Sequence, residues 1–226
     1  MAFNYSPKIV TDGLVLYLDA ANPNSYVSGS TSWNDISRGG NNGTLVNGPI
    51  FNAGNGGSIV FDGVNDYVGC KNNISLNVGN NITVLSWFYV NSTITYQPII
   101  AKTLNNNGWE LSNNSGTLRC TLRPSIAGSN NVISGTLNNN KWYHASFTFN
   151  GSNIILYLNG LQTGLTIANS VTLDTSNDLF IGRRNDGINI NYFNGNISQT
   201  TIYNRALSSQ EVLQNYNATK TRFGLI

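Results

Sequence analysis

The chain has 226 residues and a mass of 24.5 kDa, a length that fits one all-β domain. Charged residues make up 10% of it and the net charge of +2 includes no clustered basic run, which argues against a nucleic-acid partner. Hydrophobic residues at 40% exclude general disorder, and no apolar run is long enough to insert into a membrane.

The first residues indicate a protein that is not exported. Residues 1–11 show no strong periodicity and no basic segment followed by an apolar one, so we predict an N-terminal arm without a signal peptide. We therefore expect the chain to be made and folded in a cytosol. Cysteines in that compartment are usually reduced, and Cys70 and Cys120 are predicted to be free thiols.

Short apolar runs separated by Asn and Gly recur about every ten residues, a spacing typical of a β-sandwich. The first predicted strand covers residues 14–18. Residues 82–90 are apolar at almost every position, which predicts a central strand covered on both faces. Further strands are predicted at residues 58–61, 66–70, 99–102, 108–111, 117–122, 132–134, 179–182 and 195–203.

Residues 141–166 constrain the fold most. Tyr143, Phe147 and Phe149 fall on alternate positions, the period of a half-buried strand. The alternation resumes at Ile154 after a turn, and Asn159-Gly160 is a hairpin signal. Three antiparallel strands with one apolar face need a second sheet to cover that face, so we predict a two-sheet sandwich.

One helix is predicted near the C-terminus. Ser208 and Glu211 have the spacing of a capping box, and an apolar stripe follows to about Ala218. We take residues 12–218 as the domain and 219–226 as a tail. The apolar tail residues are predicted to dock on a neighbouring subunit rather than on their own sandwich: Phe223, Leu225 and Ile226.

Four sequence blocks occur in a characteristic order. They are FDGVNDYV at residues 61–68, WYHA through LYLNG at 142–160, LFIG through FNGNI at 179–197, and IYNRALSSQE at 202–211. Together they resemble laminin-G-like domains of the concanavalin A-like lectin/glucanase superfamily, over about residues 12 to 216. The resemblance implies an all-β, two-sheet antiparallel jelly-roll sandwich with one short C-terminal helix.

An enzyme has to be considered because that superfamily includes glucanases. Retaining glycosidases need two carboxylates flanking the sugar. The only glutamates, Glu110 and Glu211, lie in separate motifs, and Glu211 is used by the helix start. His144 is the only histidine, and we expect it on the sheet surface, hydrogen-bonded to neighbours. We predict no catalytic residues and no enzyme.

A calcium site is suggested by the resemblance, since related domains often bind this ion at the sandwich rim. Asp62, Asn65 and Asp66 offer oxygen ligands of the kind calcium prefers, yet the same residue types are ordinary turn formers. The acidic residues of the family pattern are also absent after Ile197, where Ser198 follows. We interpret the three residues as a turn and expect no metal and no cofactor.

Sugar binding would use an aromatic ring beside amide groups, because a sugar has an apolar face and a rim of hydroxyls. Trp109, Tyr96 and Tyr192 are the ligand-binding candidates. For each of them we favour the alternative, a half-buried aromatic of a strand or loop.

The opening residues 13–22, GLVLYLDAAN, resemble laminin-G-like domains in virion proteins of tailed phages of aquatic bacteria. That resemblance implies a non-enzymatic virion structural protein, made in the host cytoplasm, that decorates a capsid or is associated with a fibre. Its partners would be other virion proteins, repeated copies of itself and a surface glycan. The alternatives are a carbohydrate-binding lectin or adhesin and, more distantly, a glycoside hydrolase.

Overall fold

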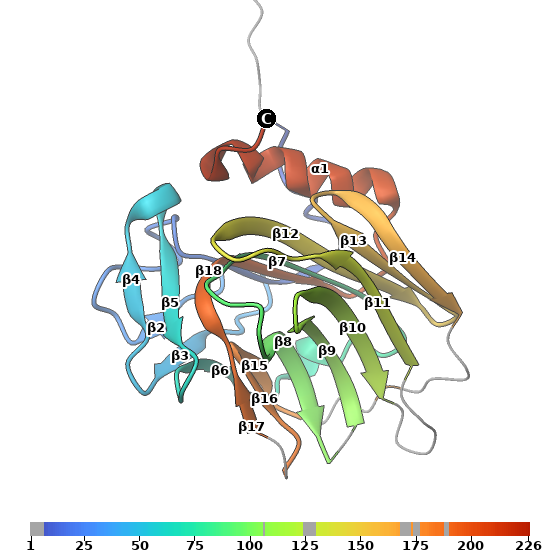
Figure 1. Ribbon diagram of the computed structural model, residues 1–226, viewed down its shortest axis with the longest axis horizontal. Coiled ribbons are helices and arrows are strands. Elements are labelled where there is room, and N and C mark those ends of the chain that lie inside the picture. The colour runs from blue at the N-terminus through green and yellow to red at the C-terminus, as the bar shows by residue number, and fades with distance from the viewer. Residues whose placement is uncertain (1–6, 106, 124–129, 168–172, 174–176, 188–189) are drawn as a thin grey trace, which may run out of the picture.

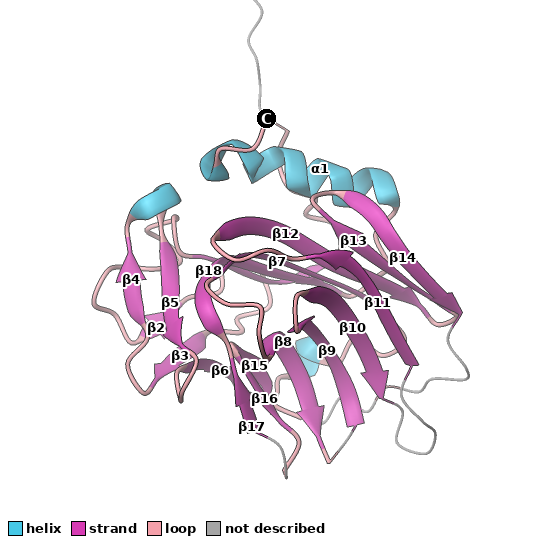
Figure 2. Cartoon of the chain, viewed as in Figure 1, coloured by secondary structure: helices cyan, strands magenta, loops and turns pink. Residues whose placement is uncertain are grey.

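The chain folds as a two-layer β-sandwich with a helical segment on one outer face (Figures 1 and 2). The computed structural model describes residues 7–105, 107–123, 130–167, 173, 177–187 and 190–226. Each large sheet has eight strands, and all pairings among the described strands are antiparallel. The predicted all-β sandwich with one short C-terminal helix is confirmed.

The first sheet, sheet A, runs β14-β13-β12-β7-β18-β5-β4, with β1 paired to β18. Its strands are β1 (Leu14–Asp19), β4 (Ile50–Asn52), β5 (Ser58–Asp62), β7 (Asn81–Val90), β12 (Lys141–Asn150), β13 (Asn153–Leu158), β14 (Leu161–Ile167) and β18 (Asn194–Tyr203). The predicted central strand is β7, which lies between β12 and β18.

The second sheet, sheet B, runs β11-β10-β9-β8-β15-β6-β3-β2. Its strands are β2 (Ser32–Trp33), β3 (Gly43–Val46), β6 (Tyr67–Cys70), β8 (Tyr96–Leu104), β9 (Asn107–Asn114), β10 (Thr117–Arg123), β11 (Asn130–Thr136) and β15 (Leu179–Ile181). A separate hairpin consists of β16 (Arg183–Asn185) and β17 (Ile190–Tyr192). The 3₁₀ helices are η1 (Gly54–Gly56), η2 (Ile74–Leu76) and η3 (Lys220–Phe223).

The meander predicted at residues 141–166 is present as β12, β13 and β14. Asn159 and Gly160 both have positive φ, 51° and 78°, as a type I′ hairpin turn requires. Alternation then sends Phe147 and Leu156 inward, where both are fully buried in the core. The same core contains Trp33 and the two free thiols of Cys70 and Cys120.

Helix α1 (Ser209–Thr219) and η3 cover the outer face of sheet A (Figure 1). The predicted capping box is confirmed: Ser208 Oγ accepts from the Glu211 amide, and the Glu211 carboxylate accepts from the Ser208 amide. This layer corrects the placement of His144, which is 3% exposed rather than on the surface. The centroid of its ring lies 5.0 Å from that of Trp87 and 5.8 Å from that of Tyr216.

Candidate functional site

Trp109 does not provide an exposed sugar platform. Its side chain is 1% exposed, and its ring packs edge-on against Phe147 of sheet A, with centroids 5.8 Å apart. Our sequence-based choice of Trp109 is therefore wrong, because the alternation along β9 turns this residue into the core. The next residue, Glu110, points to the opposite, outer face of sheet B.

The outer face of sheet B carries the polar and aromatic side chains that sequence reasoning sought. Ala101 lies opposite Glu110 and also opposite Phe180, and residues opposite one another in an antiparallel sheet share a face. Tyr96 pairs with Asn114, which alternation along β9 places on the same face as Glu110. Hairpin β16–β17 lies beside β8 (Figure 1).

Arg183 is held by three aromatic rings. Its guanidinium carbon lies 4.5 Å from the ring centroid of Tyr67, 4.9 Å from Phe180 and 5.9 Å from Tyr192. All four side chains are half-buried. Arg183 forms no ion pair with another described residue, and its Nε has no hydrogen-bond partner there. Within the described part of the chain, its positive charge therefore meets ring faces but no carboxylate.

Arg184 lies in a more enclosed network beside it. Arg184 Nε is 3.5 Å from Glu110 Oε2, and Arg123 Nη2 is 3.4 Å from Glu110 Oε1. Arg184 also pairs with Asp186, and its guanidinium lies 5.8 Å from the ring centroid of Tyr96. Glu110 is fully buried. An enclosed carboxylate with two arginine partners fixes the positions of those arginines.

We call this group the arginine–aromatic cluster, and its members are Tyr67, Tyr96, Glu110, Arg123, Phe180, Arg183, Arg184, Asp186 and Tyr192. The three arginines outnumber the two carboxylates, so the cluster has an excess of positive charge. Burial and the nearby Glu110 charge raise the pKa of the Tyr96 phenol, which stays neutral. Burial lowers the pKa of Arg123, an effect that Glu110 opposes.

Two sequence candidates, Tyr96 and Tyr192, are thus brought to one surface. Sequence reasoning missed Arg183 and Arg184, which directly follow the LFIG block. Two adjacent arginines in a chain with few charges are the signal that could have indicated them. Sequence reasoning also did not show that Arg184 pairs with both Asp186 and Glu110 and so brings the two carboxylates close together. Both carboxylates are buried and paired with arginine, an arrangement unlike the two sugar-flanking carboxylates of a glycosidase.

The residues considered for calcium form a turn. Asp62 Oδ1 accepts from the backbone amides of Val64, Asn65 and Asp66 at 2.8, 3.1 and 3.3 Å. Burial acts to raise the pKa of Asp62, but these hydrogen bonds outweigh it and lower the pKa. Among the residues that the structure describes, no three His, Cys, Asp or Glu side chains gather as a metal site would require.

The tail packs on its own sandwich. Phe223 is 7% exposed and contacts the rings of Trp87 and Trp142, with centroids 4.1 and 4.7 Å away. This corrects our prediction that Phe223 docks on a neighbouring subunit. Leu225 is half-buried, and Ile226 is fully exposed.

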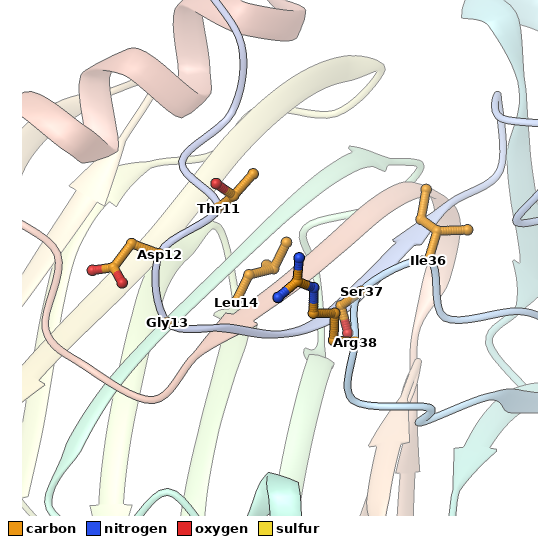
Figure 3. A pocket seen from close by; sticks show the side chains of 7 residues that line it. All are labelled: Thr11, Asp12, Gly13, Leu14, Ile36, Ser37 and Arg38. Atoms are coloured by element: carbon orange, nitrogen blue, oxygen red, sulfur yellow. The ribbon is translucent and has the colours of Figure 1, made fainter.

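A larger hollow of about 700 Å³ lies between the start of β1 and residues 36–38 (Figure 3). Arg38 extends across it toward Leu14 (Figure 3), and Asp12 on its rim pairs with Arg205 at 2.9 Å. None of the described residues that line this hollow carries an aromatic ring. It lacks the stacking surface that a sugar needs, so the arginine–aromatic cluster is the better candidate.

The two sheets form a β-sandwich with a lectin-like fold. Residues 62–213 match the family model described as Concanavalin A-like lectin/glucanases superfamily, and the chain belongs to that superfamily. No curated protein matches the sequence significantly. In the described residues, no helix has the length and apolar character needed to span a membrane.

Several solved toxin structures have a similar fold. The binding domain of Paraclostridial Mosquitocidal Protein 1 has a TM-score of 0.74 and 19% identity, over 91% of this chain and 52% of that chain. The binding domain of Botulinum Neurotoxin DC was solved in complex with SialylT. It has a TM-score of 0.71 and 17% identity, over 92% of this chain and 52% of that chain. The same binding domain was also solved in complex with rat synaptotagmin II, with a TM-score of 0.71 and 16% identity over 93% of this chain and 52% of that chain. This chain spans about half the length of each, and the similarity is one of fold.

Proposed function

We propose that this chain is a non-enzymatic binding module that holds an acidic glycan on the outer face of sheet B. The observation that carries the proposal is Arg183, a half-buried cation held against three ring faces with no carboxylate partner among the described residues. A partly buried charge gains from an opposite charge. A carboxylate or sulfate suits guanidinium because it accepts two parallel hydrogen bonds.

The rest of the arginine–aromatic cluster fits a sugar that carries such a group. Tyr67 and Tyr192 add ring faces and hydroxyls next to Arg183, and sugars stack on rings of this kind. Glu110 holds Arg184 and Arg123 in fixed positions, which lowers the entropy lost on binding.

The similar solved structures support a binding role. They are described as binding domains, and one is in complex with SialylT. Because this chain spans about half of those chains, their ligands do not locate a site on it. The position of the site rests on the cluster alone. The non-enzymatic part of the proposal rests on Glu110 and Asp186, which are both buried in arginine pairs.

A glycan array with the purified chain tests the proposal. We expect sialylated or sulfated glycans to bind and their neutral counterparts to bind more weakly. Because the attraction is between charges, we expect binding to fall as the salt concentration rises. Equal binding of acidic and neutral glycans would contradict the role of Arg183, and strong binding only to protein ligands would replace the glycan with a protein receptor.

We also keep the more specific proposal that the chain is a virion structural protein, present as repeated copies on a particle. It rests on the resemblance of residues 13–22 to phage virion proteins. In this role Leu225 and Ile226 remain the candidate partner contacts, since Phe223 is buried on its own sandwich. Cryo-microscopy of purified particles would locate the chain, and its absence from them would overturn this role.

A further inference from the structure

We propose that a second pocket, on the outer face of sheet A, binds an uncharged sugar. It is a hollow of about 320 Å³, at the small end of the usual range for ligand pockets. We call it the amide–tryptophan pocket, and its side chains come from Asn52, Asn55, Ser58, Tyr89, Trp142 and Asn196. The inference does not depend on the arginine–aromatic cluster, which lies on the other sheet.

The pocket exists because the helical layer over sheet A stops short. Tyr89 of β7 lies opposite Trp142 of β12 and opposite Asn196 of β18, so the three form one row across the outer face. In the neighbouring row of outward-facing side chains, Phe223 stacks on Trp87 and covers it. Phe223 then meets the side of Trp142 at 4.7 Å between ring centroids. Beyond that contact the row remains half-exposed.

Two of the residues that line the pocket, Trp142 and Asn55, are fixed by hydrogen bonds. Trp142 Nε1 donates to Asn55 Oδ1 at 3.1 Å, and Asn55 Nδ2 donates to the Arg222 carbonyl at 2.9 Å. Asn55 has a φ of 55° inside η1, a left-handed conformation that asparagine tolerates better than most residues. These contacts hold the Trp142 ring in place before any ligand arrives.

Unused polar groups remain around the ring. Asn196 Nδ2 donates to Ser58 Oγ at 3.1 Å, which leaves Asn196 Oδ1 without a partner among the described residues. Asn52 Oδ1 accepts from the Gly54 amide at 2.7 Å, and no described group accepts from its Nδ2. The Tyr89 hydroxyl likewise has no hydrogen bond to the described chain. The pocket therefore offers a free acceptor, a free donor and a hydroxyl that can act as either.

This set of groups selects an uncharged sugar ring. Among the described residues, no Asp, Glu, Lys, Arg or His lines the pocket, so it gives no electrostatic gain to a charged ligand. The Trp142 and Tyr89 rings lie 5.6 Å apart and tilted by 58°, which presents two aromatic surfaces to the apolar face of a pyranose. Sugar hydroxyls donate and accept at once, as the two free amide groups and the Tyr89 hydroxyl require.

Trp142 also supplies a specific spectroscopic probe. The chain has four tryptophans, of which Trp33, Trp87 and Trp109 are buried. We would follow the four indole N–H resonances of ¹⁵N-labelled protein and assign that of Trp142 with Trp142→Phe. Methyl glycosides of glucose, galactose and N-acetylglucosamine serve as probes. We expect at least one to shift the Trp142 resonance in a saturable manner at millimolar concentration.

Three variants separate binding from folding. Asn196→Ala should weaken binding about tenfold or more, because the sugar loses a hydrogen bond to the Asn196 amide and its hydroxyl is left without a partner. Tyr89→Phe removes only an unbonded hydroxyl, should weaken binding a few-fold and should leave Tm unchanged. Asn24→Ala, at an exposed asparagine outside the pocket, is the matched control and should bind as wild type. Arg183→Gln should also leave this binding unchanged, which separates it from acidic-glycan binding.

Two results would overturn the inference. One is the absence of a saturable Trp142 shift with all three glycosides. The other is unchanged affinity in both Asn196→Ala and Tyr89→Phe, which would place the sugar elsewhere on the surface.

Discussion

Phe223 lies flat on Trp87, with ring centroids 4.1 Å apart and ring planes 18° from parallel. Trp87 Nε1 in turn donates to Thr219 Oγ1 at 2.7 Å. The last turn of α1 and the segment after it are therefore part of the domain's packing. Phe223 also contacts Trp142, which lines the amide–tryptophan pocket.

Phe223→Ala should destabilise the domain by about 3 kcal/mol, because truncation of a buried phenylalanine loses its packing and leaves a cavity. Ile226→Ala is the control: its side chain is fully exposed, so the change should stay within about 0.5 kcal/mol. Urea unfolding measures both. Equal stability of Phe223→Ala and wild type would show that the tail contact contributes little in solution.

The domain should lose stability as the pH falls below neutral, because burial lowers the pKa of His144 to about 3. The unfolded chain binds a proton near the ordinary histidine pKa of about 6.5 and the folded chain does not. Stability conferred by the neutral ring is thus complete above pH 6.5 and is lost as the pH drops toward 3, by about 1.4 kcal/mol per unit.

Urea unfolding of wild type and His144→Leu at pH 7 and pH 5 checks this dependence. His144 is the only histidine, so the slope between these pH values should disappear in the variant. A slope that persists in His144→Leu would assign the pH dependence to other groups.

Ser208→Ala should cost about 1 kcal/mol of stability, the usual effect of losing a helix N-cap. Ser208 Oγ accepts from the Glu211 amide at 3.3 Å, whereas the exposed neighbour Ser209 has no such role. Ser209→Ala is therefore the matched control and should change stability little. Thermal unfolding compares the two, and equal losses would argue against the capping box as the source.

Cys70 and Cys120 should not react with a thiol reagent while the domain is folded. Both are buried and unpaired, and burial raises the pKa of Cys70 to about 12, so the reactive thiolate is scarce at neutral pH. Denaturation in urea should release two reactive thiols. Rapid labelling of the native chain would show that the sandwich opens readily.

The fold followed from the sequence because the determinants of its main elements are local. Alternation in residues 141–149, the Asn159-Gly160 turn and the Ser208 capping box each predicted the element found. The short strands β4, β16 and β17 were not predicted, since three residues give too little periodicity to recognise. Their positions depend on the sheet edges and neighbours that they pack against.

The candidate site was only partly predictable, because it depends on which face of a strand a side chain occupies. Tyr96 and Tyr192 do reach one surface, but Trp109 turns into the core one position before Glu110 turns out of it. His144 was placed on the sheet surface, since its local sequence does not reveal that α1 folds back over it. Arg183 became a candidate only when three rings from separate strands met around it.

The most direct test of the binding role is calorimetric titration of one sialylated or sulfated oligosaccharide into wild type, Arg183→Gln and Arg38→Gln. Arg38 is an exposed arginine in a different hollow and forms no ion pair within the described residues, so it controls for net charge. We predict that Arg183→Gln weakens binding tenfold or more, about 1.4 kcal/mol, while Arg38→Gln binds as wild type. Equal affinity in all three proteins would contradict the account.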